Sequence, residues 1–489
     1  MTNKLITPLF CAAAAAAAGY YVLFYAHFAV TITVILIAMA ALCLFRVLSS
    51  LNALQARKLR IPAFCAAAFA AGLVLGICAA NAGHNEIKLG ISQDKITAVQ
   101  GVLLEDPRLL SGGNVMASIS LRKCFGSSIR ENVRVSSSGK ITVFFPRGSA
   151  EKLRGFGRGT EIFTEGTLRS TERGLSISAQ SLHIIKPASA IERMRTGIRL
   201  NLISRFEGKI WGGLALALLV GIRDNLDENI TLMYREAGLS YILALSGMHL
   251  AIIAAIIAFL LKKPLGFKAA AIAGAVIISL YCLFVGPMPS LVRSAIMYLL
   301  GILTILYALP KKSMLILSLS FLIQIIITPS QGNTISFILS YLALIGILIT
   351  SRQLNSLLAG KVPNFILQPF SMSFGAFTAT AGICSFTFGT IAPVGIIASL
   401  AVIPLTTVFM TGSIIWLVLD LFSLSFILSY PLSWIYRLME ITASLSGNIP
   451  GISANPAVVL SLSILLILTI TVLEQRRRVS LARLQPFPY

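Results

Sequence analysis

Long apolar runs alternate with short polar or charged segments over most of the chain. A helix of about 20 apolar residues crosses the ~30 Å hydrocarbon core of a bilayer, so each run of that length is a candidate transmembrane helix. The pattern predicts spans at 6–26, 28–48, 61–80, 238–261, 269–286, 293–309, 313–328, 334–350, 370–391, 394–419, 422–445 and 455–473. A further apolar run, 210–222, is too short to span. The sequence therefore predicts a polytopic α-helical membrane protein.

The segment 85–187 interrupts this pattern. Short runs rich in β-branched and aromatic residues, such as 141–145 and 175–179, alternate with glycine-containing turns such as 155–159. Short strands separated by turn residues are typical of all-β domains. The segment is therefore predicted to fold as a small β-barrel or sandwich inserted between two membrane regions.

The segment 188–209 has a helical pattern. Its apolar residues recur at three- and four-residue steps, and basic residues fill much of the remainder. The apolar positions are Ile191, Met194, Ile198, Leu202 and Phe206, and the basic positions are Arg193, Arg195, Arg199, Arg205 and Lys209. This pattern predicts a basic amphipathic helix that lies in the membrane interface.

Basic residues in the loops predict the topology. They follow alternate predicted spans and also occupy the C-terminal tail, at Arg57, Lys58, Arg60, Lys262, Lys263, Lys268, Lys311, Lys312, Arg352, Lys361, Arg476, Arg477 and Arg478. Because cytoplasmic loops carry an excess of Lys and Arg, both termini are expected in the cytoplasm. The β-rich segment follows the third span and is expected outside the cytoplasmic (inner) membrane.

These features divide the chain into five predicted parts. They are three N-terminal transmembrane helices at 1–84, the β domain at 85–187, the interfacial helix at 188–209, the main transmembrane domain at 210–473 and a basic cytoplasmic tail at 474–489.

The charge distribution favours an anionic partner. The chain has 489 residues, of which 56% are hydrophobic, and a formal net charge of +22. Positive-inside bias explains part of that charge. From Lys88 to Lys209, however, 20 basic and 10 acidic residues give a net charge of +10. A polar segment with this balance attracts polyanions or anionic lipid.

Metal and nucleotide chemistry are not expected. The chain has four histidines, no CxxC pair and no complete phosphate-binding loop, since Gly139-Lys140 and Gly360-Lys361 lack the rest of that motif. No cofactor is therefore predicted, and any driving force for transport would come from a cytoplasmic partner or an ion gradient.

Three stretches resemble the ComEC competence family. The first, 217–249, ends in Ser246-Gly247-Met-His249; the second is Pro289-Ser-Leu-Val-Arg293-Ser-Ala-Ile-Met297, and the third is Ile335-Ser-Phe-Ile-Leu-Ser340-Tyr-Leu-Ala343. In the first, Tyr241 stands where the family often has a histidine, and Met248 replaces a leucine. The order and spacing of the stretches are similar to those of the family, and the resemblance covers roughly 60–445.

The resemblance implies a function and a domain order. Family members place an OB-fold-like domain outside the membrane and pass single-stranded DNA inward during natural transformation. Many add a C-terminal metallo-β-lactamase-like domain, but this sequence has no His-x-His-x-Asp-His cluster, so it is not expected to be an enzyme. The implied partners are single-stranded DNA, the lipid bilayer, a DNA-receptor protein outside, a helicase or motor inside, and a separate nuclease.

The candidate translocation path consists of polar residues in or beside the apolar runs. It comprises Arg223, Arg235, Ser246, Gly247, His249, Ser290, Arg293 and Ser340. Ionisable groups within membrane segments are functional candidates because they need a partner or a wet cavity. The alternatives are a histidine hydrogen-bonded between helices and an arginine that reaches the interface.

The candidate outer DNA-binding surface is basic. It comprises Arg122, Lys123, Arg130, Arg134, Arg154, Arg158, Arg193, Arg195 and Arg199. The aromatic residues of the β domain are all phenylalanines, at 125, 144, 145, 156 and 163. Strand alternation assigns them to the core, so DNA contact is expected to depend on charge alone.

Other functions fit the same composition. One is a transporter or flippase for a small anionic or lipid substrate. Another is an intramembrane hydrolase that uses Ser246 and His249, although no Gly-x-Ser-x-Gly elbow surrounds the serine. A third is a scaffold that docks other uptake proteins.

Overall fold

The structure is a computed structural model and describes residues 15–17, 89, 91–110, 113–127, 132–148, 153, 155–171, 174–309 and 313–484. The three predicted N-terminal spans lie outside these residues, apart from 15–17, and so do Arg130 and Arg154. The described chain forms two compact units. The barrel unit contains Asn81–Leu216 and Ile222–Asn225, and the helical unit contains Ala217–Gly221 and Leu226–Tyr489.

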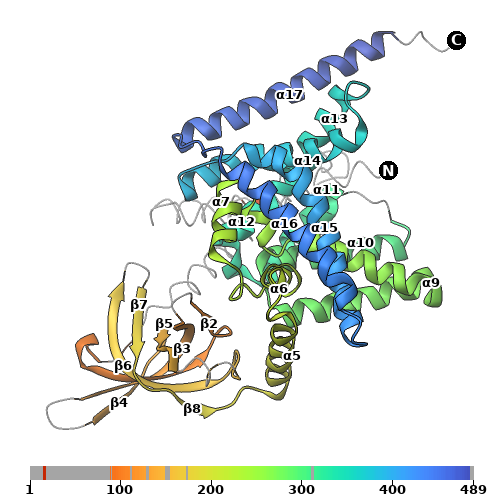
Figure 1. The fold of residues 1–489 in the computed structure, drawn as a ribbon. Coiled ribbons are helices and arrows are strands. Elements are labelled where there is room, and N and C mark those ends of the chain that lie inside the picture. Colours follow the sequence, from red (N-terminus) through yellow and green to blue (C-terminus); the bar gives the residue numbers. More distant parts are fainter. Residues whose placement is uncertain are drawn as a thin grey trace, which may run out of the picture. The chain divides into compact units, whose positions relative to one another are not determined.

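The barrel unit is built on a closed five-stranded barrel (Figure 1). Around it run β1 (Ile96–Leu103), β3 (Val115–Ser127), β5 (Lys140–Phe145), β7 (Gly174–Ala179) and β6 (Glu161–Thr171), which pairs back onto β1. The β5–β7 pair is parallel and the others are antiparallel. At its margins lie η1 (Gln93–Lys95), β2 (Arg108–Leu109), β4 (Asn132–Ser136) and β8 (His183–Lys186).

Alternating side chains fill the barrel. In β5, Ile141, Val143 and Phe145 are almost fully buried, while the residues between them are half-buried or exposed. The register of β1 and β3 shifts between Gln100 and Gly101, where a Cβ on Gly101 would lie 2.5 Å from the carbonyl oxygen of Ser120. Such a bulge bends a strand and helps a small sheet to close. The predicted small β domain of OB-like type is confirmed.

Helix α5 (Ala190–Phe206) follows β8 in the barrel unit. It begins at the N-cap Ser189, whose Oγ accepts a hydrogen bond from the backbone N–H of Glu192 at 3.4 Å. Asp106 connects the barrel to this helix. Its carboxylate accepts hydrogen bonds or ion pairs from the backbone N–H of Arg158 at 3.0 Å, from Arg195 at 3.1 Å and from Arg199.

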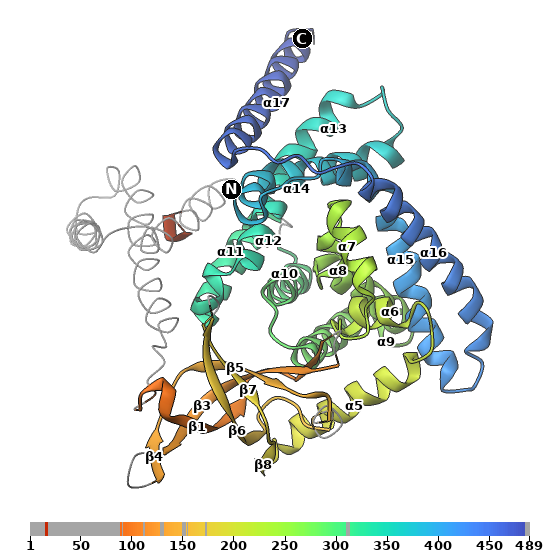
Figure 2. The ribbon, with the colours of Figure 1, turned by 60° about the vertical axis from the view of Figure 1, so that its left-hand side comes forward.

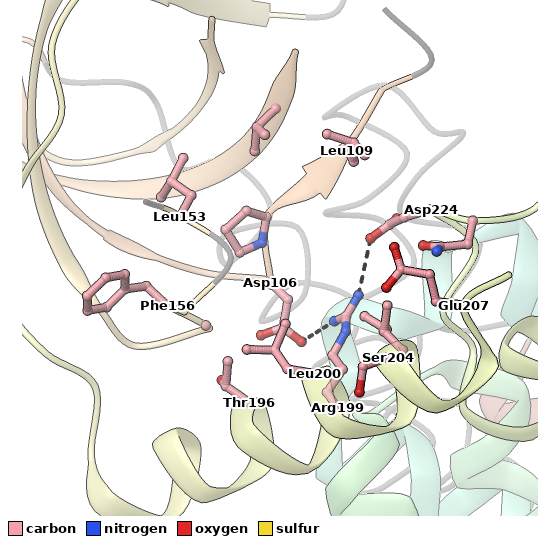
Figure 3. A pocket seen from close by; sticks show the side chains of 15 residues that line it. Asp106, Leu109, Leu153, Phe156, Thr196, Arg199, Leu200, Ser204, Glu207 and Asp224 are labelled. Atoms are coloured by element: carbon pink, nitrogen blue, oxygen red, sulfur yellow. Dashed lines mark hydrogen bonds and ion pairs between the residues drawn. The ribbon is translucent and has the colours of Figure 1, made fainter. Parts of the chain in front are cut away.

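Arg199 also bonds to Asp224, at 3.4 Å (Figure 3). Burial would raise the pKa of Asp106, but Arg199, the backbone N–H of Arg158 and Arg195 hold it below its ordinary value. Burial raises the pKa of Asp224, and Arg199 only partly opposes that change. A pocket of about 450 Å³ lies beside Arg199, lined on the barrel side by Leu153 and Phe156 among others.

The helical unit contains most of the chain. Its elements are α7 (Glu228–Glu236), α8 (Ser240–Leu243), α9 (Gly247–Val285), α10 (Pro289–Leu306), α11 (Ser313–Ile327), η2 (Pro329–Asn333), α12 (Ile335–Gly346), a π-helical turn (Ile347–Ser351), α13 (Arg352–Leu358), α14 (Asn364–Phe388), α15 (Val394–Asp420), α16 (Phe426–Gly447) and α17 (Pro456–Leu484). Helix α6 (Gly212–Val220) crosses the boundary between the units. Helices α15 and α16 lie side by side (Figure 2).

Five helical segments among the described residues are long and apolar enough to cross a membrane. They are Gly247–Val285, Pro289–Leu306, Ile335–Leu358, Val394–Asp420 and Pro456–Arg477. The predicted fold class, an α-helical membrane protein of several spans with an inserted β domain, is therefore confirmed.

The boundaries differ from prediction around α9. Two predicted spans, 238–261 and 269–286, meet in one long helix that is kinked at Gly266, where φ is 74°. Pro264 lies two residues earlier and lacks a backbone N–H for the helix. The first span also begins later than predicted, because the chain is extended at Ala244 between α8 and α9.

Replacing Asp106 with Asn should destabilise the barrel unit, because Arg195 and Arg199 would lose their shared carboxylate. We expect a loss of about 3 kcal/mol at neutral pH. In native protein Asp106 contributes fully to the free energy of unfolding above its ordinary pKa of 3.8. This contribution is lost as pH falls through the lower pKa that Asp106 has in the folded state. The difference between native protein and D106N should therefore shrink in acid.

The measurement is the reactivity of Cys124, which is fully buried in the barrel core, towards a pyridyl disulfide in increasing urea. Modified peptides from the full-length protein are quantified by mass spectrometry. Asp94, an exposed carboxylate on η1, supplies the control variant D94N. Equal urea midpoints for D106N and D94N would contradict the role given to Asp106.

Candidate functional site

The outer face of the barrel carries aromatic and basic side chains together. Residues paired directly across antiparallel strands point to the same side of a sheet. The register therefore places two rows on this face, one of Arg134, Phe125, Ala98 and Glu165, and one of Lys123, Gln100, Phe163 and His183. The rows cross β4, β3, β1, β6 and β8.

The aromatic rings on this face contact one another. Phe125 and Phe163 pack edge to face with ring centroids 5.3 Å apart, and Phe163 lies 6.2 Å from the ring of His183. The guanidinium of Arg134 lies over the Phe125 ring, 5.7 Å from its centroid. Aromatic rings beside cations can stack with nucleic-acid bases and pair with phosphates.

The assignment of the five phenylalanines to the core was right for Phe145 and wrong for the other four, since Phe156 is also half-buried outside the core cluster. Phe145 is buried in the barrel, but Phe144 is 38% exposed, and Phe125 and Phe163 are half-buried outside the core. Phe144 and Phe145 are neighbours on one strand, so they must point to opposite faces. On β3, Cys124 is buried inside the barrel, so its neighbour Phe125 must point to the outer face.

One carboxylate, Glu161, reduces the positive charge of this face. Glu161 pairs with Arg122 at 3.5 Å and accepts a hydrogen bond from Gln100 at 3.0 Å. Neither Lys123 nor Arg134 occurs among the ion pairs of the described residues. Among the described residues of this face, these two side chains are the cations that remain for an anionic partner.

The other predicted basic residues are distributed differently. Arg158 and Arg193 are exposed. Arg195 and Arg199 point toward the barrel, where Asp106 holds both. Their charge is compensated inside the barrel unit and is not presented with Lys123 and Arg134.

A second candidate site lies in the helical unit, at the start of α9. Ser246 is the N-cap of this helix and His249 is its third residue. The Nδ1 atom of His249 accepts a hydrogen bond from the backbone N–H of Ser246 at 3.1 Å, and Ser246 Oγ lies 2.9 Å from the same atom. In the neutral ring the proton therefore resides on Nε2, which is buried.

Helix α10 brings the second motif to this point. Ser290 Oγ donates to the backbone carbonyl of Leu245 at 2.6 Å, and Ser294 Oγ donates to the carbonyl of Ser290 at 2.7 Å. A Cβ on Gly247 would lie 2.8 Å from Ser294 Oγ and 3.5 Å from Nη2 of Arg293. The glycine therefore permits the close approach of α9 and α10.

Arg293 joins the second motif to the third. Its Nη1 donates to the backbone carbonyl of Ser340 on α12, and its Nη2 lies 3.4 Å from Ser294 Oγ. The guanidinium also lies over the ring of Tyr341, 5.8 Å from the centroid. The predicted residues Ser246, Gly247, His249, Ser290, Arg293 and Ser340 are thus brought together, and we call this group the polar cluster.

One member of the surrounding network, Gln324, was missed by the sequence reasoning. Gln324 on α11 donates to the carbonyl of Pro289 at 2.9 Å, and its Oε1 accepts from the hydroxyl of Tyr341 at 2.9 Å. Gln324 is fully buried. A glutamine within an apolar helix was the available signal, because such a side chain needs a partner within the protein.

The two ionisable members of the polar cluster are buried. Arg293 is 6% exposed and His249 is fully buried. Among the ion pairs of the described chain none includes Arg293, and its Nε makes no hydrogen bond. A buried cation without a carboxylate is costly and favours the approach of an anion.

The remaining predicted path residues lie elsewhere. Arg223 is exposed in the loop segment of the barrel unit, and Arg235 is exposed on α7 of the helical unit. In the part of the chain that the structure describes, no group of three or more His, Cys, Asp or Glu side chains could hold a metal ion.

Comparison with known proteins links the polar cluster to a family. A family model described as "Competence protein" matches residues 218–477, which include the whole cluster. An uncharacterized protein of Aquifex aeolicus (strain VF5) is 26% identical over 249 residues, which cover 49% of this chain and 56% of that protein. The chain therefore spans about half the length of this curated relative.

Replacing Gly247 with Ala should disturb the polar cluster, because the new methyl group would be forced against Ser294. Overpacking of this kind costs about 1–3 kcal/mol. Thermal unfolding of the purified protein in detergent should show the loss. The control is G301A in the middle of α10, where an added Cβ meets no atom within 4 Å. A melting temperature for G247A equal to that of G301A would show that close approach at Gly247 is not needed.

Proposed function

Because the chain belongs to the competence protein family, we propose that it is a DNA-uptake channel that passes single-stranded DNA across the cytoplasmic membrane during natural transformation. The observation that carries the proposal is the convergence of three separate motifs on Arg293, a buried arginine that has no carboxylate partner among the described residues. A DNA strand carries one negative charge per nucleotide and needs a wet path with fixed positive charge.

In this proposal the barrel unit receives the strand outside the membrane. Lys123 and Arg134 supply charge for phosphates, and Phe125 and Phe163 supply surfaces on which bases stack. Stacking tolerates every base, so binding is independent of sequence. The exposed Arg158 and Arg193 extend the positive field toward an incoming strand.

The helical unit then conducts the strand. The polar cluster lies on the path, and the exposed Arg235 of the same unit lies near its outer mouth. Both termini are in the cytoplasm, where a helicase or motor supplies the force. A receptor protein delivers DNA on the outer side, and a separate nuclease degrades the second strand. The channel itself acts without catalysis.

The contact between Ser246 and His249 supports a second candidate, an intramembrane hydrolase. Their 2.9 Å separation suits a nucleophile and its base. However, the backbone N–H of Ser246 already donates to the same nitrogen, and no Gly-x-Ser-x-Gly elbow surrounds the serine. Replacing Ser246 with Ala distinguishes the two functions. A channel should retain DNA uptake after this change, whereas a hydrolase whose activity drives uptake should lose it.

Replacing Phe125 with Ala should weaken binding of single-stranded DNA to the full-length protein about tenfold, since one stacked base contributes ~1–3 kcal/mol. Replacing Arg134 with Ala should instead lower the slope of log affinity against log salt by ~0.7, the value for one phosphate contact. Fluorescence anisotropy at several salt concentrations measures both effects. The control is F144A, which removes a partly exposed phenylalanine from β5.

An affinity for F125A equal to that for F144A would contradict stacking at this face. An unchanged salt slope in R134A would remove this arginine from the phosphate contacts. Neither result would bear on the membrane path, which is tested separately.

Replacing Arg293 with Ala should reduce DNA entry at least tenfold while DNA binding to the barrel persists, because the path loses its buried charge. Replacing it with Lys should restore part of the entry, since the charge remains but the planar donor group is lost. Entry of labelled DNA is measured in cells and divided by protein abundance. R437A, which removes an exposed arginine from α16, is the matched control.

Two results would refute the role of Arg293. One is normal uptake per molecule in R293A, which would leave it as a packing residue. The other is an equal defect in R437A, which would indicate a general effect of charge.

A further inference from the structure

The helical hairpin that contains α12 and α14 has an irregular turn in its first arm. Helix α12 continues through the π-helical turn Ile347–Ser351 into α13, and after a short loop α14 returns beside that turn (Figure 2). The hydroxyl of Ser351 donates to the backbone carbonyl of Ile347 within the turn. The turn lies inside Ile335–Leu358, a segment long and apolar enough to cross a membrane. Such π-turns occur frequently at functional sites.

Two glycines let the arms of the hairpin approach closely beside the turn. A Cβ on Gly346 would meet the backbone carbonyl oxygen of Gly375, and a Cβ on Gly375 would lie 2.7 Å from the carbonyl oxygen of Gly346. Thr350 lies one turn after the first glycine, and Ser371 lies one turn before the second. Because the chain doubles back between them, these two residues lie at the same level, on the helix faces that meet.

The hydroxyl groups of Thr350 and Ser371 are buried without a partner. Both side chains are fully buried, and among the described residues neither Thr350 Oγ1 nor Ser371 Oγ makes a hydrogen bond. Elsewhere in α14, Thr378 and Thr380 donate to carbonyls of their own helix at 3.0 and 2.8 Å. An unbonded buried hydroxyl costs free energy, so two of them at one place indicate a shared ligand.

We infer that Thr350 Oγ1 and Ser371 Oγ bind a Na⁺ ion, together with backbone carbonyl oxygens of the π-turn. In a π-turn each amide donates to the carbonyl five residues back, so a carbonyl is left without its usual donor where the turn joins an α-helix. Carbonyl oxygens of irregular helix within a membrane protein are suited to coordinate Na⁺.

The composition of the hairpin decides which ion fits. The segment 335–388 contains no Asp or Glu, whereas sites for Ca²⁺ and Mg²⁺ use carboxylates. Neutral oxygens alone suit a monovalent cation. The contact between Gly346 and Gly375 holds the helices close together beside the site, which favours the smaller Na⁺ over K⁺.

The sodium site is separate from the polar cluster. Ser340, the cluster residue on α12, lies about 15 Å from Thr350 along the helix at ~1.5 Å per residue. In the proposed channel the site would connect DNA entry to a sodium gradient, since an ion gradient is one of the two driving forces expected from the sequence. This connection rests on the proposed function, but the binding of Na⁺ does not.

The test measures binding of radiolabelled Na⁺ to purified full-length protein in detergent, without DNA and with choline as the replacement ion. Native protein should bind Na⁺ saturably. T350V and S371A should each raise the Kd at least about tenfold, the loss that removal of even an outer-shell partner causes. T350S keeps the hydroxyl and should retain binding. The control is T380V, which removes a hydroxyl that already donates to Ala376.

The melting temperature in choline shows whether each variant is folded. For native protein, replacing choline with Na⁺ should raise this temperature, because a ligand of the folded state stabilises it. That measurement decides the case even where T350V and S371A do not fold. Neither K⁺ nor Ca²⁺ at the same ionic strength should have this effect.

Three results would overturn the inference. They are the absence of saturable Na⁺ binding by native protein, equal affinities in T350V, S371A and T380V, and displacement of Na⁺ by an equal concentration of K⁺ or Ca²⁺. A loss of DNA uptake has no effect on these outcomes. Na⁺ binding by a protein that takes up no DNA would contradict the proposed function alone.

Discussion

A guanidinium group within an apolar helical domain must find hydrogen-bond acceptors from the protein, and this requirement organises the helical unit. Arg293 meets it with the backbone carbonyl of Ser340, the hydroxyl of Ser294 and the ring of Tyr341. These partners lie on α10 and α12, while Gly247 lets the start of α9 approach the same point. The small and hydroxyl-bearing residues of three distant motifs thus share one physical cause, because larger side chains would separate the helices from the cation.

The charges of the arginines in the two units are compensated in different ways. The difference indicates which of these arginines can interact with an anionic ligand. In the barrel unit Asp106 neutralises Arg195 and Arg199, so those charges hold α5 in place. In the helical unit Arg293 has only neutral partners, and its positive charge persists in a buried setting. Counting basic residues along the sequence could not separate these cases. Only the positions of the carboxylates do so.

The sequence predicted the membrane class, the inserted β domain and six members of the polar cluster, because polar groups inside apolar runs are conspicuous and the motif resemblance named them. It failed where the answer depends on pairing between distant segments. The outward direction of Phe125 and Phe163 depends on the register of β1 with β3 and β6. The inward direction of Arg195 and Arg199 depends on Asp106, which lies about ninety residues earlier. Gln324 was missed because no motif contains it, although its burial in an apolar helix marks it clearly.

A channel for a polyanion must attract each phosphate and also release it, and the geometry of Arg293 suits the second condition. A free arginine can bind a phosphate with two parallel hydrogen bonds, which would make a deep trap in a buried site. Here Nη1 donates to Ser340 and Nη2 contacts Ser294, so both terminal nitrogens already have neutral partners. Nε alone is without a hydrogen bond. In the proposed channel the residue therefore contributes mainly its charge to a passing strand. At the barrel face Lys123 and Arg134 form no ion pair among the described residues, which fits tighter binding at the entrance than along the path.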